Sequence, residues 1–124
     1  MSEVIAAPFL ADVIDPKGFI EPGRFSEVLR VTKGELASAS GLSREAVSKA
    51  TRLAAPATQA RLREMAEIIN RVLPWCGSVA QAFAWYRSQP IPAFGQQTAE
   101  QLVRQGRADH VLDYLGGIAL GGYA

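Results

Sequence analysis

The sequence predicts an all-α protein made of an N-terminal helix-turn-helix lobe and a small C-terminal helical lobe. Three observations lead to this fold class. From residue 23 onward, apolar residues recur three and four positions apart, as they do on one face of a helix. Ser or Thr repeatedly stands three positions before Glu or Gln, which is the pattern of a helix start. No stretch of useful length alternates apolar and polar residues as a half-buried strand would.

Length and composition set the bounds of this prediction. With 124 residues, the chain has room for one compact unit or for two small lobes that share a core. No run of eighteen or more apolar residues occurs, so we expect no transmembrane helix. The start of the chain carries acidic residues and lacks the basic start of a secretory signal. Cys76 has no second cysteine for an internal disulfide, and we therefore expect a cytoplasmic protein.

Residues 1–22 are expected to form an N-terminal arm that is extended or partly ordered. They show no clear periodicity, and prolines and a glycine interrupt them. The arm is then either a tail packed on the core or a segment that contacts a partner. Its apolar anchors would be Phe9, Leu10, Val13 and Ile14.

Residues 23–73 are expected to contain a helix-turn-helix and a linking helix. After a short helix, Thr32-x-x-Glu35 forms a capping box that starts the first helix of the motif. Gly41 ends that helix, because glycine tolerates the positive φ of a tight turn. A small residue, a glycine four positions on and a β-branched residue six positions after that glycine are typical of a helix-turn-helix. Ser43 caps the second helix, whose inward face is Ala46, Val47 and Ala50.

The outward face of that second helix is the candidate DNA-binding surface. In a helix-turn-helix, this helix enters the major groove with its N-terminal residues toward the bases. Residues 24–71 carry nine Lys or Arg and five Asp or Glu, whereas residues 1–23 have a net charge of −3 and residues 72–124 are neutral. This distribution is the weak footprint of a small DNA-binding module. The candidate DNA-binding residues are Ser43, Arg44, Glu45, Ser48, Lys49 and Arg52.

These candidates differ in the contact that each would make. Arg44 is suited to read guanine bidentately, and Lys49 and Arg52 suit phosphates. Glu45 opposes phosphate unless it meets a cytosine amino group. The alternative is a solvated helix face held by ordinary salt bridges.

Two longer helices are expected before the last third of the chain. A helix over 58–73 buries one apolar stripe, joins the lobes, and ends in the proline-containing segment 74–77. Ser78 starts a helix over 79–89 that is apolar on more than one face, so we expect it to be buried on two sides. Residues 74–124 make up the C-terminal lobe. Its aromatic centre is expected to contain Trp75, Phe83, Trp85 and Phe94.

The last third of the chain begins with a turn and ends with an apolar tail. The Pro-Ile-Pro-Ala-Phe-Gly segment over 90–95 stops the preceding helix. Thr98 opens a capping box for a new helix that ends near Gly106. Residues 120–124 are uncharged in their side chains, which makes sense if another surface covers them. The last helix before this tail has an apolar stripe of Val111, Leu112, Leu115, Ile118 and Ala119.

No catalytic, cofactor or metal site is expected, and the protein is not expected to be an enzyme. His110 has Asp109 and Asp113 nearby, but no serine or cysteine at a recognisable spacing. One histidine and the distant Cys76 do not make a metal site. The glycine pairs near the C-terminus are not phosphate loops, because no strand precedes them and no helix follows them.

About 40 C-terminal residues share a set of anchors, in fixed order, with a known family. The anchors are Trp85, the turn Pro90-Ile-Pro-Ala-Phe-Gly95, Thr98, Leu102, Gly106, Val111, Leu115, Ile118 and the closing Gly121-Gly122-Tyr123. The segment resembles the C-terminal toxin-binding domain of the Xre/MbcA/ParS antitoxins. Ala99 departs from the family pattern, in which a Thr-Pro pair is expected at this helix start. Alanine also fits the first turn of a helix.

The resemblance implies an Xre-like helix-turn-helix and an antitoxin function. Such an antitoxin neutralises a RES-domain toxin that acts on NAD through a fold related to ADP-ribosyltransferases. It would also repress its own operon at operator DNA, as a homodimer or as a toxin–antitoxin hetero-oligomer. The C-terminal helix and tail would occlude the NAD pocket of the toxin, and the expected toxin-binding residues are Leu115, Ile118, Leu120, Gly121, Gly122, Tyr123 and Ala124.

Other functions are compatible with the same residues. The first is a stand-alone dimeric helix-turn-helix transcriptional regulator whose C-terminal lobe only dimerises. The second is a small-molecule sensor that uses the aromatic residues of the C-terminal lobe. In the regulator, residues 116–124 would be a tail folded on its own domain, and deleting residues 120–124 would leave function intact.

Overall fold

The computed structural model describes the backbone of residues 2–119 and the side chains of residues 8–119. Within this range the only extended pairings are two isolated β-bridges, and no β-strand is present. The predicted all-α class is therefore confirmed. The helices are α1 (Ser2–Val13), α2 (Pro22–Leu29), α3 (Lys33–Ser40), α4 (Arg44–Ser48), α5 (Ala50–Leu53), α6 (Pro56–Cys76), α7 (Val79–Ser88), the 3-10 turn η1 (Pro92–Phe94), α8 (Ala99–Arg104) and α9 (Ala108–Ala119).

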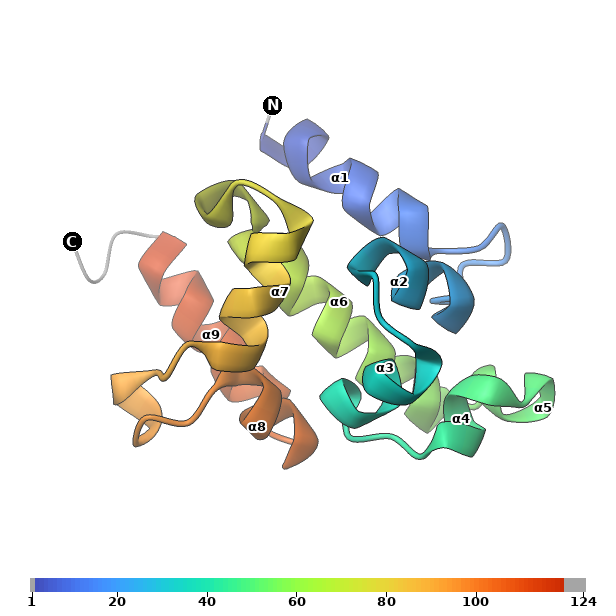
Figure 1. Ribbon diagram of the computed structural model, residues 1–124. Coiled ribbons are helices and arrows are strands. Elements are labelled where there is room, and N and C mark those ends of the chain that lie inside the picture. Colours follow the sequence, from blue (N-terminus) through green and yellow to red (C-terminus); the bar gives the residue numbers. More distant parts are fainter. Residues whose placement is uncertain (1, 120–124) are drawn as a thin grey trace.

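The long helix α6 is the element on which both predicted lobes pack. It contacts α1, α3 and α5 as well as α7, α8 and α9, and it crosses the middle of the molecule in Figure 1. Leu62, Met65 and Ile69 are fully buried at spacings of three and four, so one stripe of α6 faces the core. A single cluster of buried apolar residues contains members from both lobes. The lobes therefore share a core, and the boundary between residues 73 and 74 stays a prediction.

The N-terminal segment is helical, which corrects the expected extended arm. α1 packs on α6 and α2. Phe9 and Val13 are buried as expected, and the Phe9 ring meets the Phe25 ring edge-on at 6.1 Å between centroids. Pro8 lies inside α1, although the sequence analysis expects this proline to interrupt regular structure. Burial of this helix on α6 offsets the backbone hydrogen bond that a proline lacks.

The helix-turn-helix has the expected caps and turn. In the capping box, the Glu35 backbone N–H donates to Thr32 Oγ1 at 3.0 Å, and the Thr32 N–H donates to Glu35 Oε1 at 2.9 Å. Gly41 has φ 73°, and the Ser43 hydroxyl accepts the Ala46 N–H at 3.2 Å. These local signals were sufficient to predict α3, the turn and the start of α4.

The second helix of the motif is shorter than expected. α4 ends at Ser48, Lys49 is extended (φ −91°, ψ 125°), and Ala50 is exposed rather than inward-facing. Gln59 on α6 donates to the Leu53 carbonyl at 2.7 Å and so links α5 to the start of α6.

The C-terminal lobe is built differently from the expectation in two respects. α6 continues through Pro74 and ends at Cys76, and its C-cap Gly77 has a φ of 93°. α7 buries Ala82, Phe83 and Tyr86 on one face, while Ala80 and Ala84 on another face are exposed, so the expected burial on two sides is wrong.

The aromatic centre also differs from the prediction. Phe83 is buried as expected, but Trp75 is 54% exposed and Trp85 and Phe94 are half-buried. The fully buried aromatic residue is Tyr86, which stacks on Phe83 with 6.2 Å between ring centroids. The Tyr86 hydroxyl donates to the Ala39 carbonyl at 2.7 Å and thus ties α7 to the first helix of the helix-turn-helix.

Candidate functional site

A rigid turn between α7 and α8 forms one wall of the candidate site. Ile91 is 2% exposed and forms an isolated antiparallel β-bridge with Gln97, in which the Ile91 N–H donates to the Gln97 carbonyl at 2.9 Å. Gly95 and Gln96 both have left-handed φ values of 65° and 69°. Thr98 then forms a complete capping box that starts α8. The Pro-Ile-Pro turn is therefore fixed at both ends.

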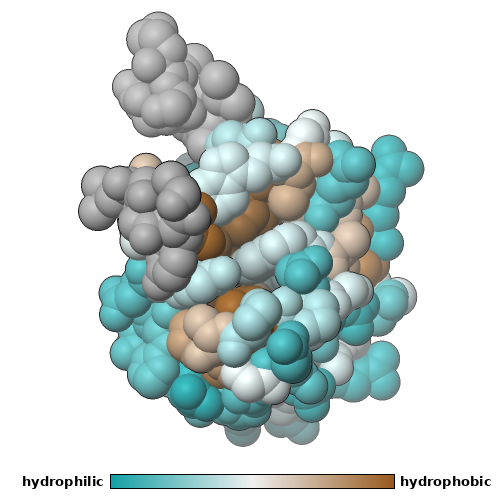
Figure 2. Space-filling view, turned by 90° about the vertical axis from the view of Figure 1, so that its left-hand side faces the viewer, coloured by the Kyte–Doolittle hydropathy of each residue, from teal (hydrophilic) through white to brown (hydrophobic). Residues whose placement is uncertain are grey.

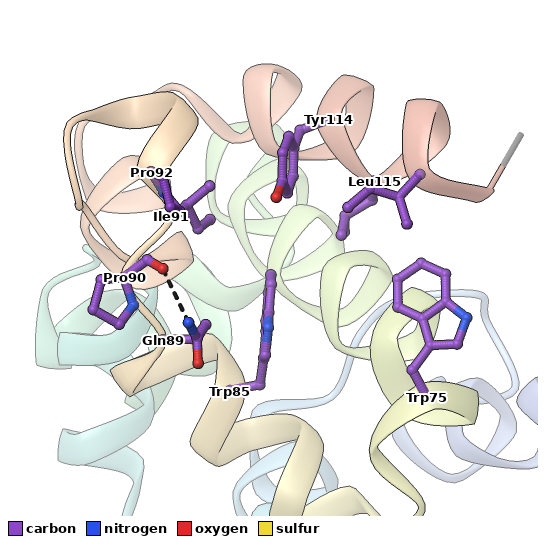
Figure 3. Close-up of a pocket in the computed structure, with 9 residues that line it drawn as sticks. Trp75, Trp85, Gln89, Pro90, Ile91, Pro92, Tyr114 and Leu115 are labelled. Carbon is purple, nitrogen blue, oxygen red and sulfur yellow. Dashed lines mark hydrogen bonds between the residues drawn. The ribbon is translucent and has the colours of Figure 1, made fainter. Parts of the chain in front are cut away.

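This turn, the end of α6, α7 and α9 enclose an apolar groove of about 200 Å³. In Figure 3, Trp75 and Trp85 lie on one side of it, and Tyr114 and Leu115 of α9 lie on the opposite side. Gln89 contributes an amide, whose Nε2 donates to the Pro90 carbonyl at 3.1 Å. None of the lining residues is charged, and the full set is Trp75, Trp85, Gln89, Pro90, Ile91, Pro92, Tyr114, Leu115 and Ile118.

The same face of the molecule is hollowed and apolar at its base. Figure 2 shows the left-hand side of Figure 1, where α9 and the turn lie, and apolar surface gathers there between more polar ridges. Phe94 supports the outer side of α9, because its ring meets Tyr114 edge-on at 5.6 Å between centroids. The groove is thus a preformed surface for an apolar group.

One comparison with known proteins covers the part of the chain that forms this groove. Residues 71–121 match the family model described as the antitoxin Xre/MbcA/ParS C-terminal toxin-binding domain. This C-terminal part of the chain is therefore a toxin-binding domain of the antitoxin type. Neither the curated proteins nor the solved structures that were searched contain a match. Every residue that lines the groove falls within the matched range.

The antitoxin family is non-enzymatic, in agreement with the prediction from the sequence. Among the described residues, no three His, Cys, Asp or Glu side chains come together where they could hold a metal ion. In the described part of the chain, no helix is long and apolar enough to cross a membrane.

Three charged side chains of the C-terminal domain, none of which lines the groove, form a cluster around Glu100. Arg87 Nε donates to Glu100 Oε1 at 2.9 Å, and Arg104 Nη1 lies 3.9 Å from Glu100 Oε2. The Arg87 guanidinium also lies 5.4 Å from the centre of the Phe83 ring. Burial, and then the Glu100 charge, raises the pKa of Tyr86 well above its ordinary value. Tyr86 is therefore a neutral hydrogen-bond donor at physiological pH.

The predicted toxin-binding residues divide into two groups. Leu115 is 1% exposed and forms the inner wall of the groove, whereas Ile118 is half-buried at its rim. Leu120, Gly121, Gly122, Tyr123 and Ala124 lie outside the described residues.

Sequence reasoning missed most of the groove. Trp75 and Trp85 were assigned to the core, and Tyr114 was not singled out. The sequence signal nearest to Trp85 is the Pro90-Ile-Pro turn, which follows the end of α7 at Ser88.

The predicted DNA-binding residues are all exposed, but they do not share one helix. Ser43 uses its hydroxyl as a helix cap, and Arg44 lies close to Gly34 at the start of α3. Glu45 is 3.9 Å from Lys49 Nζ and 3.8 Å from Arg52 Nη2. Lys49 and Arg52 lie beyond the end of α4, so they surround its C-terminal end rather than extend its outward face.

Proposed function

We propose that this antitoxin neutralises a RES-domain, NAD-consuming toxin by placing the end of α9 and the tail after it in the toxin's active site. The observation that carries the proposal is the position of α9. This helix borders the groove of the toxin-binding domain, and in the sequence the uncharged segment LGGYA follows it. A rigid helix that delivers a narrow apolar tail suits the blocking of a cleft.

The chemistry of the tail supports occlusion. Gly121 and Gly122 give a narrow backbone that can enter a cleft, and Tyr123 supplies an aromatic ring with a hydroxyl, a frequent interface anchor. Ordering the tail costs conformational entropy, so contacts along α9 must add to the affinity.

The test compares the full chain with a version that ends at Ala119. The two are mixed with the toxin that co-purifies with the full chain from the native host, and NAD consumption and complex formation are measured separately. We expect the truncated chain to fold normally and to leave NAD consumption uninhibited. Lys17→Ala, an exposed residue outside the matched range, is the control that keeps full inhibition. Inhibition by the truncated chain would overturn occlusion by the tail.

A second candidate function is repression of its own operon through the helix-turn-helix. It is favoured by the complete caps around Gly41 and by the basic charge of residues 24–71. A two-fold dimer would present two recognition helices about one DNA turn apart. Binding to a palindromic site that weakens with salt is expected, and salt-insensitive or absent binding would contradict it.

The competing proposal is a stand-alone dimeric regulator. It predicts that the chain ending at Ala119 keeps its DNA binding and all of its cellular effect. The antitoxin proposal predicts retained DNA binding with loss of toxin neutralisation, so one truncation separates the two.

A further inference from the structure

The groove beside α9 has the dimensions of a pocket for one side chain. Its volume of about 200 Å³ lies below the roughly 300–1,000 Å³ of sites that hold cofactors and other small molecules. The same volume exceeds the roughly 150 Å³ of a protein cavity that accommodates benzene. The groove is therefore too small for a cofactor or a whole helix, and it is large enough for one aromatic ring.

The lining of the groove favours an apolar ring over a charged group. None of the lining residues is charged, so an ionic group would lose its hydration without gaining a partner. Leu115 and Ile91, which are 1% and 2% exposed, form the buried part of the lining. Figure 3 shows the Trp85 ring edge-on beside Trp75, with Tyr114 across from it. Aromatic rings pair favourably with the faces and edges of other rings.

The walls of the groove are accessible and already held in place. Trp75 is 54% exposed, and among the described residues it is the large apolar side chain that is mostly exposed. Trp85 is half-buried. The β-bridge between Ile91 and Gln97 and the capping box at Thr98 fix the turn, so little order has to be gained on binding. Tryptophans in a preformed pocket are typical of the few residues that carry most of the binding energy of an interface.

The position of the groove favours a toxin as the source of the ring. Every lining residue falls within the range 71–121 that matches a toxin-binding domain, so the groove belongs to that domain. A second copy of this chain would have to bring an exposed apolar anchor of its own. Among the described residues that anchor is Trp75, which is already a wall of the groove.

We propose that the toxin inserts one aromatic side chain into this groove, where Trp75 and Trp85 hold it. The inserted ring anchors the complex, and the surrounding surface of the domain keeps water away from the contact. The inference deepens the proposed neutralisation and rests on it only in taking a toxin as the partner. It adds a contact that provides affinity and is separate from the blocking of the active site.

Affinity measurements with the toxin that co-purifies with the full chain test this contact. We expect Trp75→Ala to weaken the complex about thirtyfold, as truncation of a central interface residue does. Trp75→Phe keeps a ring and should weaken the complex much less. Phe19→Ala is the matched control, because it removes a half-buried aromatic ring outside the matched range. Unchanged affinity of Trp75→Ala overturns the proposal, and so does equal weakening by Phe19→Ala.

Fluorine NMR identifies what covers the groove. Both tryptophans of the chain line it, so the full chain labelled with fluorotryptophan gives two resonances, which Trp75→Phe assigns. We expect both resonances to shift between light and heavy water in the free chain, and to lose this response in the complex. Protection in the free chain that persists on dilution overturns the proposal, because part of the same chain is then the cover. Protection that disappears on dilution also overturns it, because the cover is then a second copy.

These measurements separate the groove contact from occlusion of the active site. They report complex formation and solvent exposure, whereas the test of occlusion reports NAD consumption. A complex that depends on Trp75 but leaves NAD consumption uninhibited contradicts occlusion alone. Full inhibition with unchanged affinity of Trp75→Ala contradicts the groove contact alone.

Discussion

The surface around α4 and the groove beside α9 are made from opposite kinds of side chain. The α4 surface presents Arg44, Glu45 and Lys49 to solvent from one short helix and the residue that follows it. The groove presents tryptophan, tyrosine, proline and isoleucine side chains, and none of its lining residues is charged. A charged surface suits a polyanion such as DNA, whereas an apolar groove suits a protein segment. The proposed DNA-binding surface and the groove thus differ in chemistry although they share one core.

The two surfaces are nevertheless mechanically joined. Tyr86 of α7 bonds the Ala39 carbonyl of α3, and Arg61 Nη1 of α6 donates to the Ser40 carbonyl at 3.1 Å. The turn glycine Gly41 lies directly against α8, because a Cβ built on it would stand 3.0 Å from the Arg104 Cα. We therefore expect damage to these links to affect both surfaces, and damage elsewhere to affect one.

The largest effect is expected from Tyr86→Ala. Removing a fully buried ring costs about 3–5 kcal/mol of unfolding free energy, and it also removes the α7–α3 link. Urea unfolding measures the loss, and it should occur in one transition. Two separate transitions would show that the lobes fold independently and would contradict the link between the two surfaces. Tyr86→Phe, which keeps the ring, should lose much less.

Gly41→Ala should have the next largest effect. Alanine in the left-handed region costs about 1–2 kcal/mol. The new Cβ would in addition meet Arg61 Nη1 at 2.8 Å and the Arg104 Cα at 3.0 Å. Gly18→Ala is the matched control, since Gly18 has φ 89° and open space around it. The melting temperature of Gly41→Ala should be lower than that of Gly18→Ala. An equal decrease in both variants would mean that the contact of Gly41 with α8 does not matter.

The two capping boxes offer a balanced pair of substitutions, one in each region. Thr32→Ala and Thr98→Ala should each cost about 1 kcal/mol. Because the core is shared, both should lower the midpoint of the same unfolding transition. Hydrogen exchange would locate the weakened amides in α3 for the first and in α8 for the second. Loosening of both helices by either variant would argue against separate local stabilities.

Arg44→Ala should hardly change stability and should act on the α4 surface alone. An exposed substitution of this kind changes the unfolding free energy by less than about 0.5 kcal/mol. We expect weaker DNA binding with a reduced salt slope, and unchanged tryptophan fluorescence from the groove. Arg63→Ala on α6, exposed and equal in charge change, is the control. Equal loss of DNA binding in both variants would mean that only net charge is read.

The smallest effect distinguishes the two capping boxes by pH. The Thr32 backbone N–H, and then its side chain, lowers the pKa of Glu35, whereas Gln101 at the same place in the other box does not titrate. A lowered folded-state pKa gives stability that is present above the unfolded pKa and is lost as pH falls through the folded value. Between pH 6 and pH 3, the unfolding free energy of Glu35→Gln should therefore depend slightly less on pH than that of the unchanged chain. An unchanged pH profile would contradict this role.

Local chemistry made part of the structure predictable from sequence. The Thr32, Ser43 and Thr98 caps and the Gly41 turn depend on residues three or four positions apart, and all are present as predicted. The helix of residues 2–13 was not predicted, because its apolar residues show no period and Pro8 lies within it. The early end of α4 at Ser48 was also missed, because the sequence carries no helix-stop signal at the extended Lys49.

By itself, the sequence determined the helical class, the caps and the helix-turn-helix, because each rests on short spacings along the chain. The likeness to the toxin-binding domain rests instead on the order of residues over 71–121. Only the tertiary structure decided which apolar residues are buried. Trp75 and Tyr86 are both aromatic, yet one is 54% exposed and the other fully buried. Burial depends on what packs against a side chain from distant segments. The groove, built from four such segments, exists only after α6, α7, the Pro-Ile-Pro turn and α9 have come together.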